Sequence, residues 1–439
     1  MLYQYLMKQH IGSPSVPVVK AGEEVKRGQL LGQKPAEALG ANVFSSVSGT
    51  VTEVQEDRVM VEEKGTDFST YLPLTESDPI RLVEESGLVG LGGAGFPTYV
   101  KLKTKFPEGK GVVLVNAAEC EPILSHNLKR IEKDPEGLVK SLILAMELVK
   151  AVKGIIAIKY HHKEAIALLE KEIAKYPGKE LSVYQLENIY PVGEERAIVR
   201  DALGILLEPE QLPSAADAIV LNAETLYRMK EAIEEKKPLI DKDITVAGKL
   251  QEDAAIKVFL DEPLGQSVES LIQKAGGIGE RYGEIIMGGP FTGHSCTMED
   301  PMVKTSGGII VAEEFFPGPE KIGLLVCACG ANRERLIEQS EKMGSQYVGV
   351  EYCKQAKEVK GTRKCENPGH CPGQVQKVMA LKKAGAQAVL VSNCTDCTNT
   401  VMSCAPQLGL PVYHCTDGAL RSVNYKMIRR FKEIGRAHV

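Results

Sequence analysis

The chain has 439 residues, of which 43% are hydrophobic and 25% charged, so it is long and apolar enough for three or four domains with separate cores. Its 53 basic and 58 acidic residues give a formal net charge of −5, which offers no basic field for nucleic acid and no polybasic segment for an anionic membrane. No apolar run reaches the roughly 20 residues that cross a bilayer, and the N-terminus lacks a secretory signal pattern. We expect a cytoplasmic protein that neither binds nucleic acid nor inserts directly into a membrane.

Residues 1–75 are predicted to form a small β domain. The segments VPVVKAGEEVKRGQLLGQ and ANVFSSVSGTVTEV contain short strand-like runs that glycine turns separate. Their pattern resembles the sandwich of lipoyl and biotinyl carriers. No lysine lies at the hairpin tip where such carriers attach their group, so we predict the barrel-sandwich fold without the carrier function.

Helical and strand patterns alternate from residue 76 to residue 237, which predicts a mainly parallel sheet covered on both faces. Residues 238–316 predict a compact α/β unit of ubiquitin-like proportions. After a Pro-Gly-Pro hinge, residues 319–439 predict a cysteine-rich α/β domain with a basic final helix. The fold class is therefore multidomain α/β.

A glycine-rich loop, GLGGAG at residues 90–95, follows a predicted helix. The dinucleotide fingerprint requires a strand in that place, so this is not an ordinary Rossmann turn. Bare backbone N–H groups and a following helix N-terminus could bind a phosphate, with Lys101 neutralising its charge. The alternative is a tight turn in which the glycines allow close packing.

Two further segments place polar groups where strands end. Asn116, Glu119 and Glu121 follow the strand GVVLVN, at the edge where open α/β sheets bind ligands. The segment Tyr190-Pro-Val-Gly-Glu-Glu195 again places a glycine and two acids after strand-like sequence. These groups could accept hydrogen bonds from a flavin or a nicotinamide, although each segment alone could be a solvated turn.

The motifs GLGGAGFPTYVK, NAAECEP and YPVGEERAI, in this order, resemble the flavin and NADH signatures of the complex I 51-kDa subunit and of RnfC. The likeness covers about the first 315 residues. It implies a barrel-sandwich domain, a Rossmann-like FMN domain and an SLBB β-grasp domain, with NADH near Phe96, Glu121 as a catalytic residue at the nicotinamide, and Glu195 nearby. Leu91 departs from the pattern, because an arginine is usual there. The residues implied to contact FMN are Gly90, Gly92, Gly95, Lys101, Asn116, Glu119, Gly193, Glu194, Asn222 and Thr225.

The resemblance to RnfC ends after residue 318, because the chain lacks the two ferredoxin-type cysteine runs of that family. An RnfC-like chain with a different cysteine-rich domain resembles the PrdC family of electron-transfer proteins. That resemblance implies transfer of electrons from NADH to a protein acceptor, D-proline reductase.

Nine of the eleven cysteines lie in the final quarter of the chain, and reduced thiols or metal ligands are expected in a cytosolic protein. Cys327 and Cys329 precede a predicted helix whose N-terminus would stabilise a thiolate, which suits dithiol exchange and makes both candidate catalytic residues. Cys120 and Cys296 are interpreted as ordinary buried groups. The candidate metal ligands, which we place at or just after strand ends, are Cys353, Cys371, Cys394 and Cys397.

These observations favour hydride transfer from NADH to FMN and onward transfer through the cysteine-rich domain. An iron–sulfur cluster, which a faint similarity to a small hydrogenase subunit also implies, is preferred there to a dithiol, and a dithiol to zinc. Two other functions remain open, a component of an Rnf-type membrane complex and a non-catalytic zinc-binding scaffold.

Overall fold

Two antiparallel sheets form the N-terminal part of the computed structural model, which describes residues 1–392 and 394–426. Val59 and Val61 are fully buried while Arg58 and Met60 are partly exposed, as expected for a strand that covers a core on one face. The sheets run β1-β7-β6-β3 and β2-β4-β5, which confirms the predicted β-rich part. The strands are β1 (Leu2–Leu6), β2 (Val16–Pro17), β3 (Glu24–Val25), β4 (Leu30–Gln33), β5 (Val43–Phe44), β6 (Gly49–Val54) and β7 (Arg58–Glu63).

A four-stranded parallel sheet in the order β10-β9-β8-β11 follows, as the alternation of helices and strands predicts. Asn116 and Asn222 end the neighbouring strands β8 and β11 in register, so the sheet brings them together at its carboxyl edge. The elements are α1 (Pro79–Glu85), α2 (Thr98–Leu102), β8 (Val112–Asn116), α3 (His126–Lys133), α4 (Pro135–Val149), β9 (Lys153–Lys159), α5 (Lys163–Ile173), β10 (Glu180–Leu186), α6 (Glu195–Leu203), the 3-10 turn η1 (Pro213–Ala216), β11 (Ala218–Asn222) and α7 (Ala223–Glu234).

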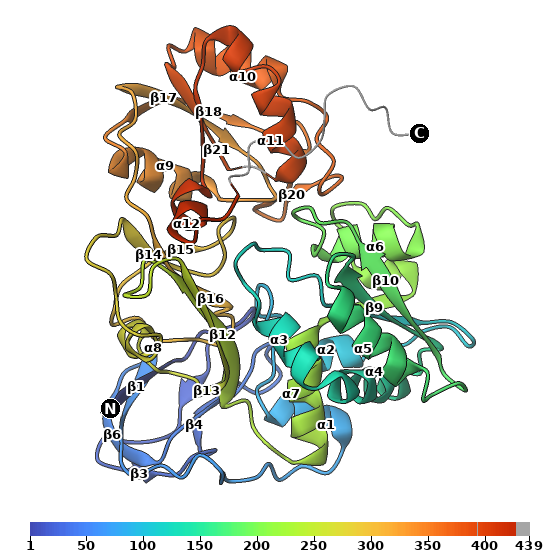
Figure 1. Cartoon of the computed structure of the whole chain (residues 1–439). Coiled ribbons are helices and arrows are strands. Elements are labelled where there is room, and N and C mark those ends of the chain that lie inside the picture. Colours follow the sequence, from blue (N-terminus) through green and yellow to red (C-terminus); the bar gives the residue numbers. More distant parts are fainter. Residues whose placement is uncertain (393, 427–439) are drawn as a thin grey trace.

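A mixed sheet in the order β13-β12-β16-β14-β15 comes next, and it packs directly on the preceding part (Figure 1). Val113 and Val115 belong to the same buried apolar cluster as Val246 and Ile309, so the two parts share one core. This sheet fits the predicted β-grasp unit, whose assignment stays a prediction. Its elements are β12 (Asp241–Gly248), β13 (Ala255–Pro263), α8 (Val268–Lys274), β14 (Glu284–Met287), β15 (His294–Cys296) and β16 (Gly308–Ala312).

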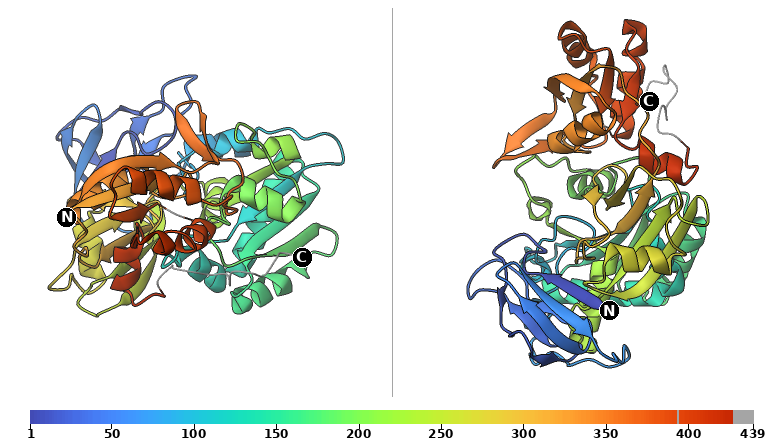
Figure 2. Two further views of the ribbon diagram at one scale, coloured as in Figure 1. Left: turned by 90° about the horizontal axis from the view of Figure 1, so that it is seen from above. Right: turned by 90° about the vertical axis from the view of Figure 1, so that its left-hand side faces the viewer.

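The C-terminal part contains a second parallel sheet, β18-β17-β21-β22, and lies above the rest of the molecule in Figure 1 and the right view of Figure 2. An antiparallel hairpin, β19–β20, was not predicted, and the expected basic final helix falls mainly on residues 427–439, outside the described ranges. None of the described helices is long and apolar enough to cross a membrane. The elements are β17 (Lys321–Val326), α9 (Arg333–Lys342), β18 (Gln346–Tyr352), β19 (Ala356–Val359), β20 (Thr362–Cys365), α10 (Val375–Lys383), β21 (Ala388–Val391), α11 (Thr395–Met402), the 3-10 turn η2 (Pro406–Leu408), β22 (Val412–His414) and α12 (Asp417–Ser422).

Candidate functional site

A cavity of about 890 Å³ opens where the parts of the chain meet. Its volume lies in the range of small-molecule and cofactor sites. The walls come from the glycine loop and the carboxyl edge of the first parallel sheet, from loops of the mixed sheet, and from the start of the C-terminal part. The predicted site residues that line it are Gly92, Asn116, Glu119, Glu121, Gly193, Glu194, Asn222 and Cys329.

The glycine loop divides into a packing end and an open end. Gly95 has φ +73°, and a Cβ there would lie 3.0 Å from the Cα of His10, so this glycine allows the N-terminal part to pack closely. Gly93 is exposed, and nothing lies within 4 Å of where its Cβ would be. A Cβ at Gly92 would lie 2.5 Å from Nδ2 of Asn222. The packing interpretation therefore holds at Gly95, while the backbone of Gly92 and Gly93 borders the cavity.

The two asparagines at the sheet edge hold neighbouring backbone in place. The Asn116 side-chain N–H donates to the carbonyl of Gly193 at 2.8 Å, which fixes the loop before α6. The Asn222 side-chain oxygen accepts from the N–H of Thr225 at 3.3 Å and caps α7. Their amides form the polar floor that the parallel sheet predicts at its carboxyl edge.

Glu119 and Glu194 stabilise the N-termini of two helices. Glu119 accepts hydrogen bonds of 2.9 and 3.0 Å from two N–H groups in the first turn of α3. Glu194 accepts bonds of 2.8 and 3.0 Å from two N–H groups in the first turn of α6. Both carboxylates therefore position backbone at the cavity as well as lining it.

Glu121 connects the first parallel sheet to the mixed sheet. Its oxygens accept from the N–H of Phe291 at 2.8 Å, and from the N–H and hydroxyl of Thr292 at 3.0 and 2.6 Å. Burial raises the pKa of Glu121 although these hydrogen bonds oppose the shift. The carboxyl predicted to act at the nicotinamide thus holds the loop between β14 and β15.

Several predicted cofactor contacts lie outside the cavity lining. Lys101 donates to the Glu195 carboxylate and to the carbonyl of Val220 at 2.9 Å, so its ammonium is engaged within the protein. The buried Thr225 hydroxyl accepts from the N–H of Leu91 at 3.0 Å. The predicted residues outside the lining are Gly90, Gly95, Phe96, Lys101, Glu195 and Thr225.

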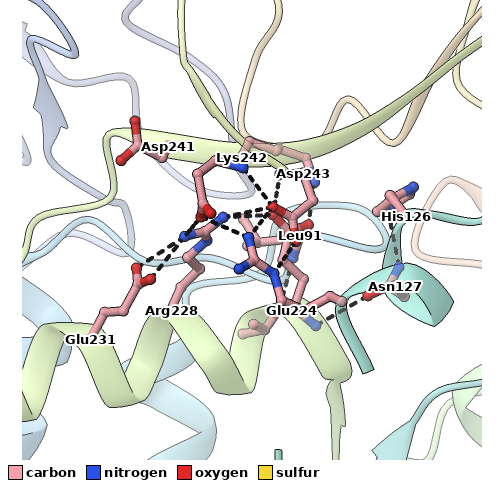
Figure 3. A network of polar contacts seen from close by, with 12 residues as sticks. Leu91, His126, Asn127, Glu224, Arg228, Glu231, Asp241, Lys242 and Asp243 are labelled. Carbon is pink, nitrogen blue, oxygen red and sulfur yellow. Dashed lines mark hydrogen bonds and ion pairs between the residues drawn. The ribbon is translucent and has the colours of Figure 1, made fainter. Parts of the chain in front are cut away.

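A network of buried ion pairs joins α7 to β12 behind the sheet edge (Figure 3). Lys242 and Glu224, each at most 1% exposed, form an ion pair of 2.6 Å, and Arg228 pairs with Asp243 at 2.9 Å. Burial opposes ionisation of Asp243, but Arg228 and Arg130 lower its pKa. Each charge has a close partner, so this network supports the architecture and leaves no charge for a ligand.

Five thiols gather at the carboxyl edge of the second parallel sheet, around Cys327. The pKa of Cys327 lies well below its usual value because the other four thiols, Cys329 first, donate hydrogen bonds to it. The pKa of each of these four thiols is raised, and in each case the largest cause is its hydrogen bond to Cys327. The partners of Cys327 are Cys329, Cys353, Cys394 and Cys397. The topology thus brings these five cysteine side chains into one hydrogen-bonded group, in which Cys327 has the most strongly lowered pKa.

Two more residues border this cluster. Cys371 lies beside Cys397, and hydrogen bonds led by that thiol lower the pKa of Cys371 to about 7. The Gln374 side-chain N–H groups approach the sulfurs of Cys353 and Cys371, at 3.1 Å each. In the described ranges, no three Cys, His, Asp or Glu side chains are spaced to hold one metal ion. The sulfur donor set suits iron–sulfur or dithiol chemistry, and the choice among these and zinc stays a prediction.

The structure corrects two expectations about these cysteines. Neither Cys371 nor Cys397 lies at a strand end: Cys371 is in the loop between β20 and α10, after the unpredicted hairpin, and Cys397 is in the first turn of α11. The thiol at a helix N-terminus is Cys394, whose sulfur accepts from the N–H of Cys397 at 3.4 Å and caps α11. The helix after Cys329 is capped by Asn332 instead.

The expectation that Cys120 and Cys296 are ordinary buried groups holds only in part, because each is partly buried. Both residues are partly exposed and line the cavity. The pKa of Cys120 is raised to about 11, chiefly by burial of its thiol, so that thiol is uncharged at neutral pH.

Tyr190 bridges the cavity and the cysteine cluster. Its ring stacks on Phe291 with centroids 3.8 Å apart and planes 2° from parallel. Its hydroxyl donates to the Cys329 carbonyl at 2.5 Å, and its backbone exchanges hydrogen bonds with Thr395, next to Cys394. Tyr190 therefore touches three parts of the chain at once.

Sequence reasoning missed other residues of the lining. His126 is 4% exposed, its Nδ1 lies 3.2 Å from the Thr245 hydroxyl, and burial lowers its pKa to about 4. Arg363 and Lys364 reach the cavity from β20. The basic pair directly before Cys365 was a visible signal, but only the hairpin turns it towards the cavity.

Comparisons with known proteins agree with this arrangement. Residues 83–231 match the family model described as the Nuo51 FMN-binding domain, and residues 2–70 match the RnfC barrel sandwich hybrid domain. These matches confirm the predicted barrel-sandwich and complex I 51-kDa-like domains.

Three curated relatives extend the comparison beyond these domains. A component of the Na(+)-translocating ferredoxin:NAD(+) oxidoreductase complex of Acetobacterium woodii is 33% identical over 323 residues, covering 69% of this chain and 71% of that protein. The corresponding component of the proton-translocating complex of Clostridium ljungdahlii is 29% identical, covering 69% of each chain. The cobalamin reductase PduS of Salmonella typhimurium is 32% identical over 250 residues, covering 57% of this chain and 53% of its own. The chain therefore belongs to the RnfC-like family.

Proposed function

We propose that this protein is an NADH-dependent flavin oxidoreductase that accepts electrons in the cavity and passes them to its C-terminal cysteines. The observation that carries this proposal is a single cavity bordered both by the asparagine floor of the first parallel sheet and by Cys329 of the second. The match to an FMN-binding domain and the oxidoreductase relatives support the first half of the route.

The residues at the first sheet edge fit an FMN group. Open backbone at Gly92 and Gly93 suits close approach by a phosphate or a ring, and a side chain at Gly92 would collide with Asn222. Asn116 and Asn222 supply amide groups, and Glu119 and Glu194 hold the surrounding helices. FMN, when bound, supplies acceptance of a hydride and release of single electrons.

The dinucleotide-facing residues are proposed on the resemblance alone. Glu121 would act by holding the loop at Phe291 and Thr292 in place, because its carboxylate already accepts hydrogen bonds from that loop. Phe96 and Glu195 lie outside the cavity lining, so any contact with NADH would be at its margin.

The onward route begins at Cys329, which lines the cavity and hydrogen-bonds Cys327. Cys327 and Cys329 would form the dithiol of a two-electron relay. Cys353, Cys371, Cys394 and Cys397 would supply ligands in the iron–sulfur alternative, and the central place of Cys327 adds it to that set. Whether the thiols act as a dithiol or as cluster ligands, they belong to the same group of neighbouring cysteines around Cys327.

The acceptor is proposed to be a reductase outside this chain. The combination of an RnfC-like front with a different cysteine-rich domain favours D-proline reductase. This assignment rests on resemblance, and electron transfer from the NADH-reduced protein to purified proline reductase tests it.

A second candidate is a component of an Rnf-type membrane complex, which the Acetobacterium and Clostridium relatives favour because both belong to ion-translocating complexes. This candidate predicts that the tagged protein sediments with membranes and brings membrane proteins of the complex with it. Recovery in the supernatant with a reductase would support the first candidate.

The first experiment is the visible absorption spectrum of the anaerobically purified protein before and after NADH. Flavin bands that bleach on addition of NADH would support electron entry, and an underlying broad shoulder would support a cluster. A colourless protein with stoichiometric zinc that cannot be reconstituted with FMN would overturn the proposal in favour of a scaffold.

A further inference from the structure

The cations that border the cavity come mostly from the C-terminal part. Leu91 of the glycine loop lines the cavity but is uncharged, and Lys101 is engaged with Glu195 outside the lining. Arg196 lines the cavity, but its guanidinium bonds Glu194 and the carbonyl of Cys365 and is only 4% exposed. Among the described residues, Arg363 and Lys364 are the other cations in the lining.

Lys364 is the cation best placed to take a ligand. Its side chain is partly exposed at the cavity, and within the described ranges its ammonium makes no hydrogen bond or ion pair. Arg363 beside it is held over the Tyr352 ring at 3.9 Å and donates to the Ala356 carbonyl at 3.2 Å. The hairpin therefore presents a free ammonium beside a fixed guanidinium.

The strand pairing adds a second observation. Lys364 lies directly opposite Lys357 in the β19–β20 register, and like charges in that arrangement destabilise a hairpin. Lys357 points its charge to Glu366, 3.4 Å away, and lies outside the cavity lining. Lys364 has no carboxylate partner of this kind, so its charge destabilises the hairpin unless an anion binds to it.

We propose that Lys364, assisted by Arg363, binds the pyrophosphate of the nicotinamide dinucleotide, so that the C-terminal part completes the NADH site. This inference rests on the proposed function. Two phosphorylated ligands need two anion subsites. The uncharged backbone of Gly92 and Gly93 serves the flavin side, and the cations of the hairpin serve the other side.

NADH affinity of the flavin-loaded protein tests the proposal. Lys364→Ala is expected to raise the Kd for NADH by about 10- to 100-fold, the usual effect of losing a charge-assisted hydrogen bond. Lys364→Arg should keep most of the affinity, and the matched control Lys357→Ala should keep all of it. Affinity for reduced nicotinamide riboside, which lacks phosphate, should be the same in Lys364→Ala and the unchanged protein.

Further measurements show which ligand's phosphate Lys364 binds and whether the variant is folded. Titration of the apoprotein with FMN and with riboflavin should give the same affinities in Lys364→Ala as in the unchanged protein. If Lys364→Ala binds NADH as tightly as the unchanged protein does, the proposal is overturned. If its affinity for FMN falls at the same time, Lys364 binds the flavin phosphate instead. If the unchanged protein binds FMN but no NADH, the proposed function itself fails. Unaltered binding of the riboside shows that the variant is folded.

Discussion

Both parallel sheets of this protein carry their candidate functional side chains at the carboxyl edge. Those of the first sheet border an open cavity, whereas most of those of the second are buried. In the first sheet, Asn116 and Asn222 end adjacent strands and border an open cavity. In the second, Cys327 and Cys353 follow adjacent strands, and both are buried among other thiols. Only Cys329 and Cys365 of the described C-terminal cysteines reach the cavity.

This difference separates two kinds of exchange. An open, amide-lined edge can admit and release small molecules, whereas a buried sulfur cluster can pass electrons or protons without admitting a substrate. Tyr190, which contacts Phe291 and Cys329, lies between the two. Four predictions break or sharpen the comparison.

The largest effect is expected from the network behind the first sheet. Asp243→Ala removes the fully buried carboxylate that pairs with both Arg228 and Arg130, so the free energy of unfolding should fall by about 3–5 kcal/mol. Urea unfolding measures this change. The matched control is Lys140→Ala, which removes an exposed pair with Glu136 and should leave unfolding unchanged. Equal stability of the two variants would show that the network does not anchor the sheet.

The second prediction separates the functions of the two edges. Cys327→Ser removes the sulfur that contacts four other cysteines, so electron transfer to an external acceptor should slow by about two to three orders of magnitude, as for groups that act as a unit. Flavin reduction by NADH should keep its rate in stopped-flow traces. Cys404→Ser, which alters a buried thiol outside the partners of Cys327, should leave both rates unchanged. Slowed flavin reduction in Cys327→Ser would contradict the division.

The third prediction concerns pH at the first edge. Burial lowers the pKa of His126 to about 4, with Glu119 opposing the shift and Lys242 adding to it. The unfolded chain therefore binds more protons between pH 6.5 and 4, so His126 contributes stability that is complete above pH 6.5 and lost on acidification, by about 3 kcal/mol in total. In His126→Gln, the difference in unfolding free energy between pH 7 and pH 4.5 should shrink. An unchanged difference would exclude His126 as its source.

The smallest effect is expected at the bridge. Tyr190→Phe keeps the stack on Phe291 and removes only the hydrogen bond to Cys329, so electron transfer from the cavity to the cysteines should slow about fivefold, equivalent to one hydrogen bond of about 1 kcal/mol. The rate of flavin reduction by NADH should not change. If both rates fall together, Tyr190 shapes the cavity rather than the link between the two edges.

Local sequence patterns predicted the architecture better than the contacts within the site. The alternation of helices and strands predicted the first parallel sheet and the α/β class of the C-terminal part, and the position of Asn116 after an apolar strand predicted its place at the cavity. The partner of Lys101 could not be predicted in this way, because Glu195 lies 94 residues further along the chain. The hairpin that carries Lys364 was missed because its polar strands bury little apolar surface.

The most direct test of the account is an anaerobic titration of the flavin-loaded protein with NADH, counting the electrons taken up per flavin. If the two edges are connected, the protein should accept more electrons than the flavin alone stores, and Cys327→Ser should abolish the excess. Uptake limited to the capacity of the flavin in the unchanged protein would contradict the proposed transfer from the cavity to the cysteine cluster.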